Sequence, residues 1–326
     1  MKVFVVIPTI RTLTFLREWK DQFSNCHIII VEDHPTIQIE TPTVHSLGVF
    51  HYAWKNIASD FGNDEWIFSR KNAGIRSYGF WKAYTSGADI IITLDDDCYP
   101  VEDGFVNQHI DNLSAETPER WINTYPHSNF VYTRGIPYSI RKKHRVMISH
   151  GLWTNKIDLD GRTEIRYPNL HLPSYPPFRQ FVPTGAYFPM CSMNLAFRRE
   201  ATPLMYFPLM GFDPSGRHWG YDRFDDIWAG VFAKKIIDHL DFAVVNGSPF
   251  VDHRKASDVR SNIERERKGL EMNESLWKLV DSVKLTKHTL LESYRELAAK
   301  ISFPKDYYFI KLKKAMILWS TLFIRS

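Results

Sequence analysis

The sequence has few cysteines and no long apolar run. Of its 326 residues, only Cys26, Cys98 and Cys191 are cysteines, and they lie far apart without a CxxC pair. This pattern argues against a zinc site or a disulfide framework and favours a reducing compartment. No stretch approaches the ~20 apolar residues that cross a bilayer, and the apolar start of the chain is too short for a signal peptide. We therefore expect a cytoplasmic protein.

Two further features are missing. No GxGxxG motif follows the first apolar strand, so the dinucleotide-binding fingerprint is absent and we expect neither flavin nor NAD. The formal net charge is only +4, which gives no reason to propose a nucleic-acid partner.

The most informative stretch is a short apolar strand that ends in three aspartates. Residues 89–94 are mostly β-branched and apolar, and Asp95, Asp96 and Asp97 follow. Neighbouring like charges are unfavourable unless a cation or strong donors offset them. Mg²⁺ is often held by one or two carboxylates plus substrate phosphates. The stretch therefore predicts a metal–nucleotide site, and a solvated acidic turn is the alternative.

Two apolar strands open the chain. Residues 3–7 and 27–31 have the continuous apolar pattern of buried parallel strands, and residues 12–23 between them show helical spacing. This order predicts a doubly wound nucleotide-binding half. A later helix begins near Arg76, where the first turn would bind an anion and the guanidinium would contact phosphate. A solvated helix residue is the alternative for Arg76.

The second half adds two groups of acidic or metal-binding residues. Asp225 and Asp226 occupy the first turn of a helical pattern, where the helix dipole favours carboxylates. Capping alone would explain one of them, but two are more than a cap needs. His253 follows an apolar strand at residues 242–245 and is a candidate third metal ligand.

Two segments between these groups predict a sugar site. Residues 149–155 mix polar and aromatic side chains, including His150 and Trp153, as in a sugar pocket. A core histidine packed beside a core tryptophan is the alternative. Residues 156–180 are rich in Pro, Tyr, Asp and Arg and predict a long surface excursion, which in compact domains often acts as a lid.

The pattern changes near Asp258. We predict a catalytic domain over residues 1–257 and a helical extension over residues 258–326. The last predicted helix, over residues 307–324, is basic and amphipathic. Such a helix packs on its own domain or a sister subunit more often than on a membrane surface. We therefore expect no membrane association, and the C-terminal helices are a candidate surface for a homo-oligomer.

Several segments carry the motifs of one known family. They are LDDDC at 94–98, RGIPYSIR at 134–141, SHGLW at 149–153, FPMCSMNLAF at 188–197 and YDRFDDIWAG at 221–230. Through these motifs the chain resembles the reversibly glycosylated polypeptides, the UDP-arabinopyranose mutases best known from plants. The resemblance extends from residues 6–11 to near Lys268, and more weakly into the C-terminal helices. Residues 156–180 depart from the family pattern, and the motif at 221–230 contains a two-residue insertion if Gly220 matches the family's glycine.

The resemblance implies an α/β fold of GT-A type, a nucleotide-binding sheet flanked by helices that holds a nucleoside-diphosphate (NDP) sugar through Mn²⁺ or Mg²⁺. It also marks Arg134 as the site of self-glycosylation. A guanidinium is a poor nucleophile because it stays protonated. Arg134 is therefore either a covalent sugar carrier or an electrostatic element whose glycosylation is a side path.

These inferences give a set of predicted site residues. The predicted metal ligands are Asp95, Asp97 and His253. The predicted catalytic residues are Arg134, Asp225, Asp226 and His150, the last three as groups that move protons between sugar hydroxyls. The predicted NDP-sugar-binding residues are Thr9, Arg11, Asp33, Asn72, Arg76, Asp96, Arg141, Trp153 and Asn194.

Three functions compete at this point. The resemblance favours a flavin-independent, metal-dependent mutase that interconverts pyranose and furanose forms of an NDP-sugar such as UDP-arabinose. The alternative is a metal-dependent GT-A glycosyltransferase that passes the sugar to an acceptor. A self-glycosylated scaffold without catalysis is the third.

Overall fold

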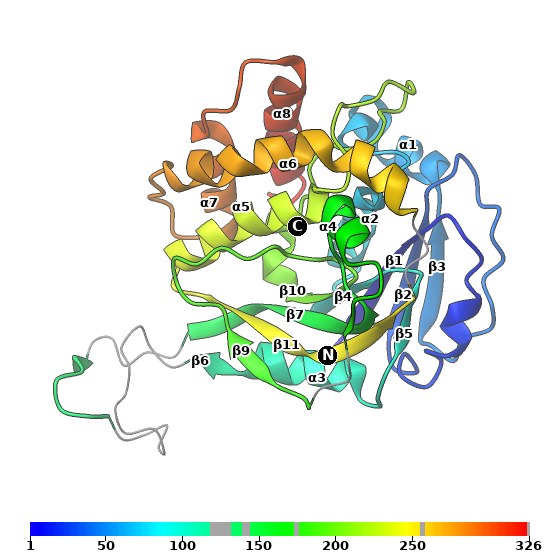
Figure 1. The fold of residues 1–326 in the computed structure, drawn as a ribbon, viewed down its shortest axis with the longest axis horizontal. Helices are drawn as coiled ribbons and strands as arrows, with labels where there is room; N and C mark the ends of the chain where they lie inside the picture. Colours follow the sequence, from blue (N-terminus) through cyan, green and yellow to red (C-terminus); the bar gives the residue numbers. More distant parts are fainter. Residues whose placement is uncertain (118–131, 139–143, 173–175, 255–257, 325–326) are drawn as a thin grey trace.

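A mixed β-sheet runs through the molecule, with helices on both of its faces (Figure 1). The structure is a computed structural model that describes residues 1–117, 132–138, 144–172, 176–254 and 258–324. Arg141 lies outside the described residues. The expected α/β fold, a sheet flanked by helices, is confirmed.

The bounds of the elements are as follows. The strands are β1 Val3–Thr9, β2 His27–Glu32, β3 Gly48–Tyr52, β4 Ile90–Leu94, β5 Cys98–Pro100, β6 Glu116–Thr117, β7 His144–Lys156, β8 His171–Leu172, β9 Arg179–Phe181, β10 Asn194–Arg198 and β11 Ala243–His253. The α-helices are α1 Trp54–Phe61, α2 Arg76–Thr85, α3 Phe105–Ser114, α4 Gly161–Arg166, α5 Asp225–His239, α6 Val259–Asp281, α7 Leu290–Lys300 and α8 Tyr307–Thr321.

The strands lie in the order β3-β2-β1-β4-β10-β7-β11-β5. The first four are parallel, with Val5 of β1 opposite Ile28 of β2 and Ile92 of β4. Strand β10 then runs antiparallel to both β4 and β7. The doubly wound prediction therefore holds for the N-terminal strands, and the direction changes where β10 joins the sheet.

Alternating side chains of the sheet feed two hydrophobic cores. Val6 of β1 packs in the core under α2, α5, α7 and α8, whereas Val5 and Ile7 pack against α3 and residues 13–23. Helix α2 can lie close to the sheet because Gly79 has no side chain. A Cβ added there would come within 2.4 Å of Val6 Cγ1. This close packing brings the start of α2 to the carboxyl end of β4.

The C-terminal helices share the first of these cores. Buried residues of α6, α7 and α8 pack in one cluster with residues of the sheet and of α5. Trp319 of α8 is fully buried, and its Nε1 donates to the carbonyl of Pro203 at 3.0 Å. Residues 258–324 are thus packed onto the rest of the chain. Among the described residues, none of the helices combines the length and apolarity needed to cross a bilayer.

One local prediction was wrong. Residues 12–23 form a 3-10 helix at Thr14–Arg17 and turns, and no α-helix, although the apolar residues expected to face inward are buried. Apolar spacing identifies the buried face but does not separate an α-helix from a compact 3-10 segment. The described residues of 156–180 are mostly exposed or partly exposed, as predicted for a surface excursion, and they include helix α4, strand β8 and the start of β9.

Candidate active site

Polar side chains gather where β1, β2 and β4 end. Because these strands are parallel, their carboxyl ends meet at one edge of the sheet, and the backbone N–H of Asp33 donates to the carbonyl of Thr9 at 2.9 Å. The three aspartates follow β4 directly at this edge. In open α/β sheets ligands bind at this position. Thr9, Asp33 and the aspartates therefore lie around one edge of the sheet.

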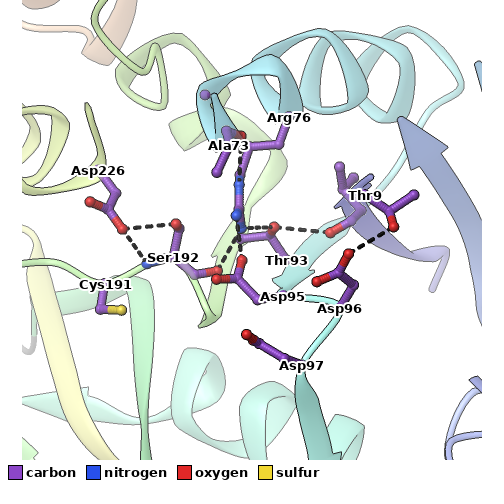
Figure 2. A network of polar contacts seen from close by, with 12 residues as sticks. Thr9, Ala73, Arg76, Thr93, Asp95, Asp96, Asp97, Cys191, Ser192 and Asp226 are labelled. Carbon is purple, nitrogen blue, oxygen red and sulfur yellow. Dashed lines mark hydrogen bonds and ion pairs between the residues drawn. The ribbon is translucent and has the colours of Figure 1, made fainter. Parts of the chain in front are cut away.

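Arg76 reaches into the centre of this edge from the first residue of α2 (Figure 2). Its side chain is 0% exposed, and it forms an ion pair with Asp95, whose side chain is 32% exposed. The other guanidinium contacts are to Ala73 O at 3.0 Å, Thr93 Oγ1 at 2.9 Å and Ser192 O at 2.8 Å. Burial alone lowers the pKa of Arg76, but the charge of Asp95 raises it above its ordinary value. The guanidinium is thus bound by protein groups, and phosphate binding by Arg76 stays a prediction.

Asp96 turns away from Asp95 towards the end of β1 (Figure 2). Its Oδ2 accepts from Thr9 Oγ1 at 2.8 Å, and its Oδ1 accepts from Arg11 Nη1 at 2.5 Å. The same Arg11 nitrogen lies 3.5 Å from Asp97 Oδ2. Thr9, Arg11 and Asp96 therefore form one connected group beside the metal-ligand candidates.

Asp97 and His253 come together through the pairing of β5 with β11. His253 lies opposite Cys98 in this antiparallel pair, so its ring is next to the aspartate that precedes Cys98. Burial and the neighbouring charge of Asp95 raise the pKa of Asp97, and His253 opposes that rise. His253 Nδ1 donates to the carbonyl of Lys156 at 3.0 Å, which directs the lone pair of its neutral form to Nε2. Metal-binding histidines commonly have this second contact.

These residues fit a divalent cation that takes part of its coordination from a substrate. Among the residues described, no three His, Cys, Asp or Glu side chains are grouped so that they could hold a metal ion, so Asp95, Asp97 and His253 are not assembled as a three-ligand site. Asp95 and Asp97 instead offer carboxylate oxygens close to each other, and both side chains are partly exposed. Mg²⁺ and Mn²⁺ bound with NDP substrates use such open sites, in which the phosphates supply further oxygen ligands.

Asp33 lies at the end of β2 within a set of donors. Its Oδ1 accepts from Trp54 Nε1 and its Oδ2 from the backbone N–H of Asn72, both at 2.8 Å. Burial raises the pKa of Asp33, and these hydrogen bonds act in the opposite direction. The Asn72 side chain accepts from Gly74 N at 2.7 Å and so caps the short 3-10 turn before α2. Asp33 and Asn72 thus fix the loop that leads to Arg76.

The acidic pair opens α5 on the other side of Arg76. Asp226 Oδ2 accepts from both the backbone N–H and the Oγ of Ser192 at 2.8 Å (Figure 2). A Cβ added at Gly74 would lie 3.1 Å from Asp225 Oδ2, so Asp225 abuts the loop before α2. Burial and the charge of Asp226 raise the pKa of Asp225 to about 7. The pair can therefore hold or release a proton near neutral pH.

His150 and Asn194 lie behind this edge in a buried network. His150 Nδ1 donates to Asn246 Oδ1 at 2.8 Å, and its Nε2 accepts from Cys191 N at 3.0 Å. Burial lowers the pKa of His150 to about 4. Asn194 Nδ2 donates to the carbonyls of Leu152 and Pro249 at 2.8 Å. The structure thus gives both side chains protein partners, and their roles in catalysis and sugar binding stay predictions.

Trp153 accompanies His150 on β7. The two rings meet edge to face with centroids 6.1 Å apart, and Trp153 is half-buried. This packing resembles the core pair considered as the alternative for the segment, and sugar binding by Trp153 stays a prediction.

Arg134 is not part of this arrangement. It is exposed in the described segment 132–138, which lies well outside the body of the sheet (Figure 1). No described contact joins Arg134 to the residues at the ends of β1 and β4. The structure therefore brings together the nucleotide-side candidates but not the residue that the family resemblance marks.

Sequence reasoning missed three residues at this edge. Ser192 positions Asp226, while Asp158 accepts from Cys191 Sγ at 3.6 Å. Arg223, just before α5, has a left-handed backbone with φ 63°. A non-glycine residue in this conformation is worth attention because such backbone is frequent at functional sites. The sequence carries no direct sign of it.

The fold and the site define a class of protein. An α/β sheet presents carboxylates, an arginine and a proton-holding acidic pair at the carboxyl end of its parallel strands, as nucleotide-binding α/β proteins do. A family model described as reversibly glycosylated polypeptide matches residues 1–325. The chain belongs to the reversibly glycosylated polypeptide family.

Relatives with assigned names agree with this membership. The chain is 36% identical to UDP-arabinopyranose mutase 1 of Arabidopsis thaliana, over 97% of this chain and 90% of that protein. It is also 36% identical to UDP-arabinopyranose mutase 1 of Oryza sativa subsp. japonica, over 97% of this chain and 88% of that protein.

Solved structures give only weak likenesses. A putative nucleotide-diphospho-sugar transferase from Desulfovibrio desulfuricans G20 overlays with a TM-score of 0.32 at 12% identity, over 85% of this chain and 98% of that chain. The protein A197 from STIV overlays with a TM-score of 0.30 at 10% identity, over 81% and 92% of the two chains. Overlays with TM-scores this low do not establish a shared fold.

Proposed function

We propose that this chain is a nucleotide-sugar mutase that interconverts the pyranose and furanose forms of a UDP-sugar such as UDP-arabinose, without flavin. The observation that carries the proposal is 36% identity along 97% of the chain to proteins named UDP-arabinopyranose mutase. Acidic and cationic groups at the ends of β1 and β4 and at the start of α5 could bind the diphosphate and transfer protons in such a reaction.

In this proposal the diphosphate binds beside Asp95 and Asp97. These two carboxylates, with His253 beside them, would hold Mn²⁺ or Mg²⁺. When bound, the metal neutralises the charge that develops on the leaving diphosphate. Arg76 is locked to Asp95 and so fixes the orientation of that carboxylate.

The acidic pair serves the sugar. In pyranose–furanose exchange the diphosphate leaves C1 with the electron pair of the anomeric C–O bond, and an oxocarbenium ion forms. A second sugar hydroxyl then adds to C1 and loses its proton, the former ring oxygen leaves C1 and gains a proton, and a diphosphate oxygen bonds to C1 again. Asp225, with a pKa of about 7, and Asp226 can accept and return such a proton. Ser192 orients Asp226 for this task.

We also propose self-association through the C-terminal helices. Ile310 and Ile317 are exposed seven residues apart on one face of α8. Such a stripe is typical of a helix that pairs with another helix. We further propose that the protein is cytoplasmic, because its three cysteines are free and buried, as is usual in a reducing compartment.

An assay on the purified protein with UDP-arabinopyranose and Mn²⁺ separates the candidate functions. A new nucleotide-sugar peak of unchanged mass supports the mutase. Release of UDP with transfer to an added acceptor would instead establish a glycosyltransferase. Label bound only to the protein would leave a scaffold.

The metal is tested by comparing two aspartates. Asp97→Asn should weaken Mn²⁺-dependent UDP binding by roughly tenfold or more, as EDTA should for the unchanged protein, because a metal ligand is lost. Asp103→Asn is the matched control, since Asp103 is exposed after β5 and is not a predicted site residue. Isothermal titration with UDP measures both. UDP affinity that ignores EDTA and Asp97→Asn would remove the metal from the proposal.

A further inference from the structure

Arg223 occupies an unusual position next to the acidic pair. It lies two residues before Asp225, and its backbone has φ 63°, in the left-handed region that L-residues other than Gly, Asn and Asp seldom adopt. Such a conformation persists only when the surroundings fix it.

Glu266 of α6 provides that fixation. Arg223 Nε donates to Glu266 Oε1 at 2.7 Å, and the Glu266 side chain is only 6% exposed. The other oxygen, Oε2, accepts from the backbone N–H of Gly161 at 2.7 Å. A Cβ added at Gly161 would lie 2.8 Å from Ile263 Cγ1, so α4 begins tightly against α6. One buried carboxylate thus anchors both Arg223 and the start of α4.

The contact with Glu266 uses only the Nε side of the Arg223 guanidinium. Only Nε is bonded to Glu266, and no described residue forms a hydrogen bond with the two terminal nitrogens of Arg223. The side chain is 29% exposed. Arg76 differs from Arg223 in this respect, because Arg76 is 0% exposed and is bound on three sides by protein groups. Arg223 has donors to offer a ligand.

Asp158 is a second charged residue near Asp226. Cys191 Sγ contacts Asp158 Oδ2 at 3.6 Å, and the next residue, Ser192, holds Asp226 at 2.8 Å. Asp158 is exposed, and together with Asp226 it adds to the charges that raise the pKa of Arg223 above its ordinary value, although burial alone lowers it and Glu266 contributes more. An arginine and an exposed carboxylate therefore lie near Asp226.

We propose that Arg223 and Asp158 are sugar-contacting specificity residues, which rests on the proposed function of the site. The carboxylates of Asp158, Asp225 and Asp226 disfavour a phosphate at this position. Neighbouring sugar hydroxyls fit it, because a guanidinium donates to their oxygens and a carboxylate accepts from their protons. The diphosphate is then held at Asp95 and Asp97, and the sugar extends towards Arg223.

The test compares binding of UDP with binding of UDP-arabinopyranose by isothermal titration in Mn²⁺. In Arg223→Lys, Arg223→Gln and Asp158→Asn, the Kd for UDP-arabinopyranose should rise about tenfold, as expected for one lost charged hydrogen bond. The Kd for UDP should stay within about twofold in all three variants. Arg217→Gln is the matched control, since Arg217 lies exposed on the same loop against Tyr307 and should leave both constants unchanged.

Several outcomes would overturn the proposal. Equal losses for UDP and UDP-arabinopyranose would make Arg223 a phosphate ligand, and unchanged constants for both would make it a structural residue. If Arg223→Gln fails to fold, Asp158→Asn decides alone, because an exposed carboxylate is not needed for folding. Absence of mutase activity in the unchanged protein, with the sugar-selective loss intact, would count against the proposed reaction only. An unchanged protein that binds UDP and UDP-arabinopyranose equally would count against the sugar contact itself.

Discussion

Arg76 and Arg134 were both predicted to act on the substrate, and the molecule treats them in opposite ways. Arg76 is fully buried at the start of α2 and is bonded to Asp95, Thr93 and Ser192. Arg134 is exposed in segment 132–138, outside the body of the sheet (Figure 1). The first is held by the same packing that forms the core, whereas no described element of the sheet positions the second.

The difference separates two parts of the proposed reaction. The nucleotide side is pre-organised, because the sheet register and the packing of α2 fix the carboxylates and their partners before any ligand arrives. Substitutions there should change stability together with binding. Substituting a residue outside the core, such as Arg134, should change turnover without changing stability. Three substitutions test this separation, in order of their expected effect on the free energy of unfolding.

The largest effect is expected for Arg76→Met. Removing the guanidinium leaves Asp95 without its cation and several buried acceptors without their donor, which should cost on the order of 3–5 kcal/mol of stability. Arg145→Met is the matched control, because the Arg145 side chain is 50% exposed and its ion pair with Glu200 is a surface pair. That control should cost less than about 1 kcal/mol. Urea unfolding measures both, and equal costs for the two variants would show that Arg76 is not a structural centre.

A smaller and pH-dependent effect is expected for Asp225→Asn. The pKa of Asp225 is raised from 3.8 to about 7 in the folded chain, so folding favours its protonated form. The stabilisation is fully present below pH ~4 and is lost as the pH rises through 7. The unchanged protein should lose on the order of 2 kcal/mol between pH 5 and pH 7 through this group. Asp225→Asn should remove that slope.

Urea unfolding at pH 5, 6, 7 and 8 without metal or nucleotide tests this effect. Asp111→Asn, at an exposed position of α3, is the control and should keep the slope of the unchanged protein. A variant Asp225→Asn whose stability still falls between pH 5 and 7 as steeply as the unchanged protein would assign the titration to another group.

The sequence predicted those parts of the site that depend on local order along the chain. Continuous apolar strands at residues 3–7 and 27–31, and the aspartates after residues 89–94, were identifiable because a buried strand and its terminal charges are adjacent in sequence. The parallel pairing of β1 with β2 and β4 then brought their ends to one edge.

The partners across that edge could not be predicted in the same way. Arg76 was expected to bind phosphate, but its ion pair with Asp95 depends on how closely α2 packs on β1 at Gly79. Asp158 and Ser192 come from loops far away in the sequence, and only the tertiary fold places them beside Asp226. The two nitrogens of His150 likewise find their partners on β11 and after β9, which the pattern of residues 149–155 does not contain.

The smallest effect on stability is expected for Arg134→Ala and Arg134→Lys. Both variants should keep the free energy of unfolding within about 0.5 kcal/mol, because the side chain is exposed and outside the core. UDP affinity should also stay unchanged, since no described contact links Arg134 to the ends of β1 and β4. Turnover should nevertheless fall by roughly 10²-fold or more if the guanidinium stabilises charge in the transition state, where lysine does not replace its planar fork.

Urea unfolding, titration with UDP and the mutase assay measure the three quantities on the same samples, and mass spectrometry during turnover decides the role. A sugar adduct on Arg134 that forms and decays as fast as product appears would make it a covalent carrier. An adduct that accumulates slowly, with turnover lost in both variants, supports the electrostatic role and places self-glycosylation on a side path. Lost UDP affinity in Arg134→Ala would instead show that segment 132–138 contributes to the nucleotide side, and the separation of the two arginines would fail.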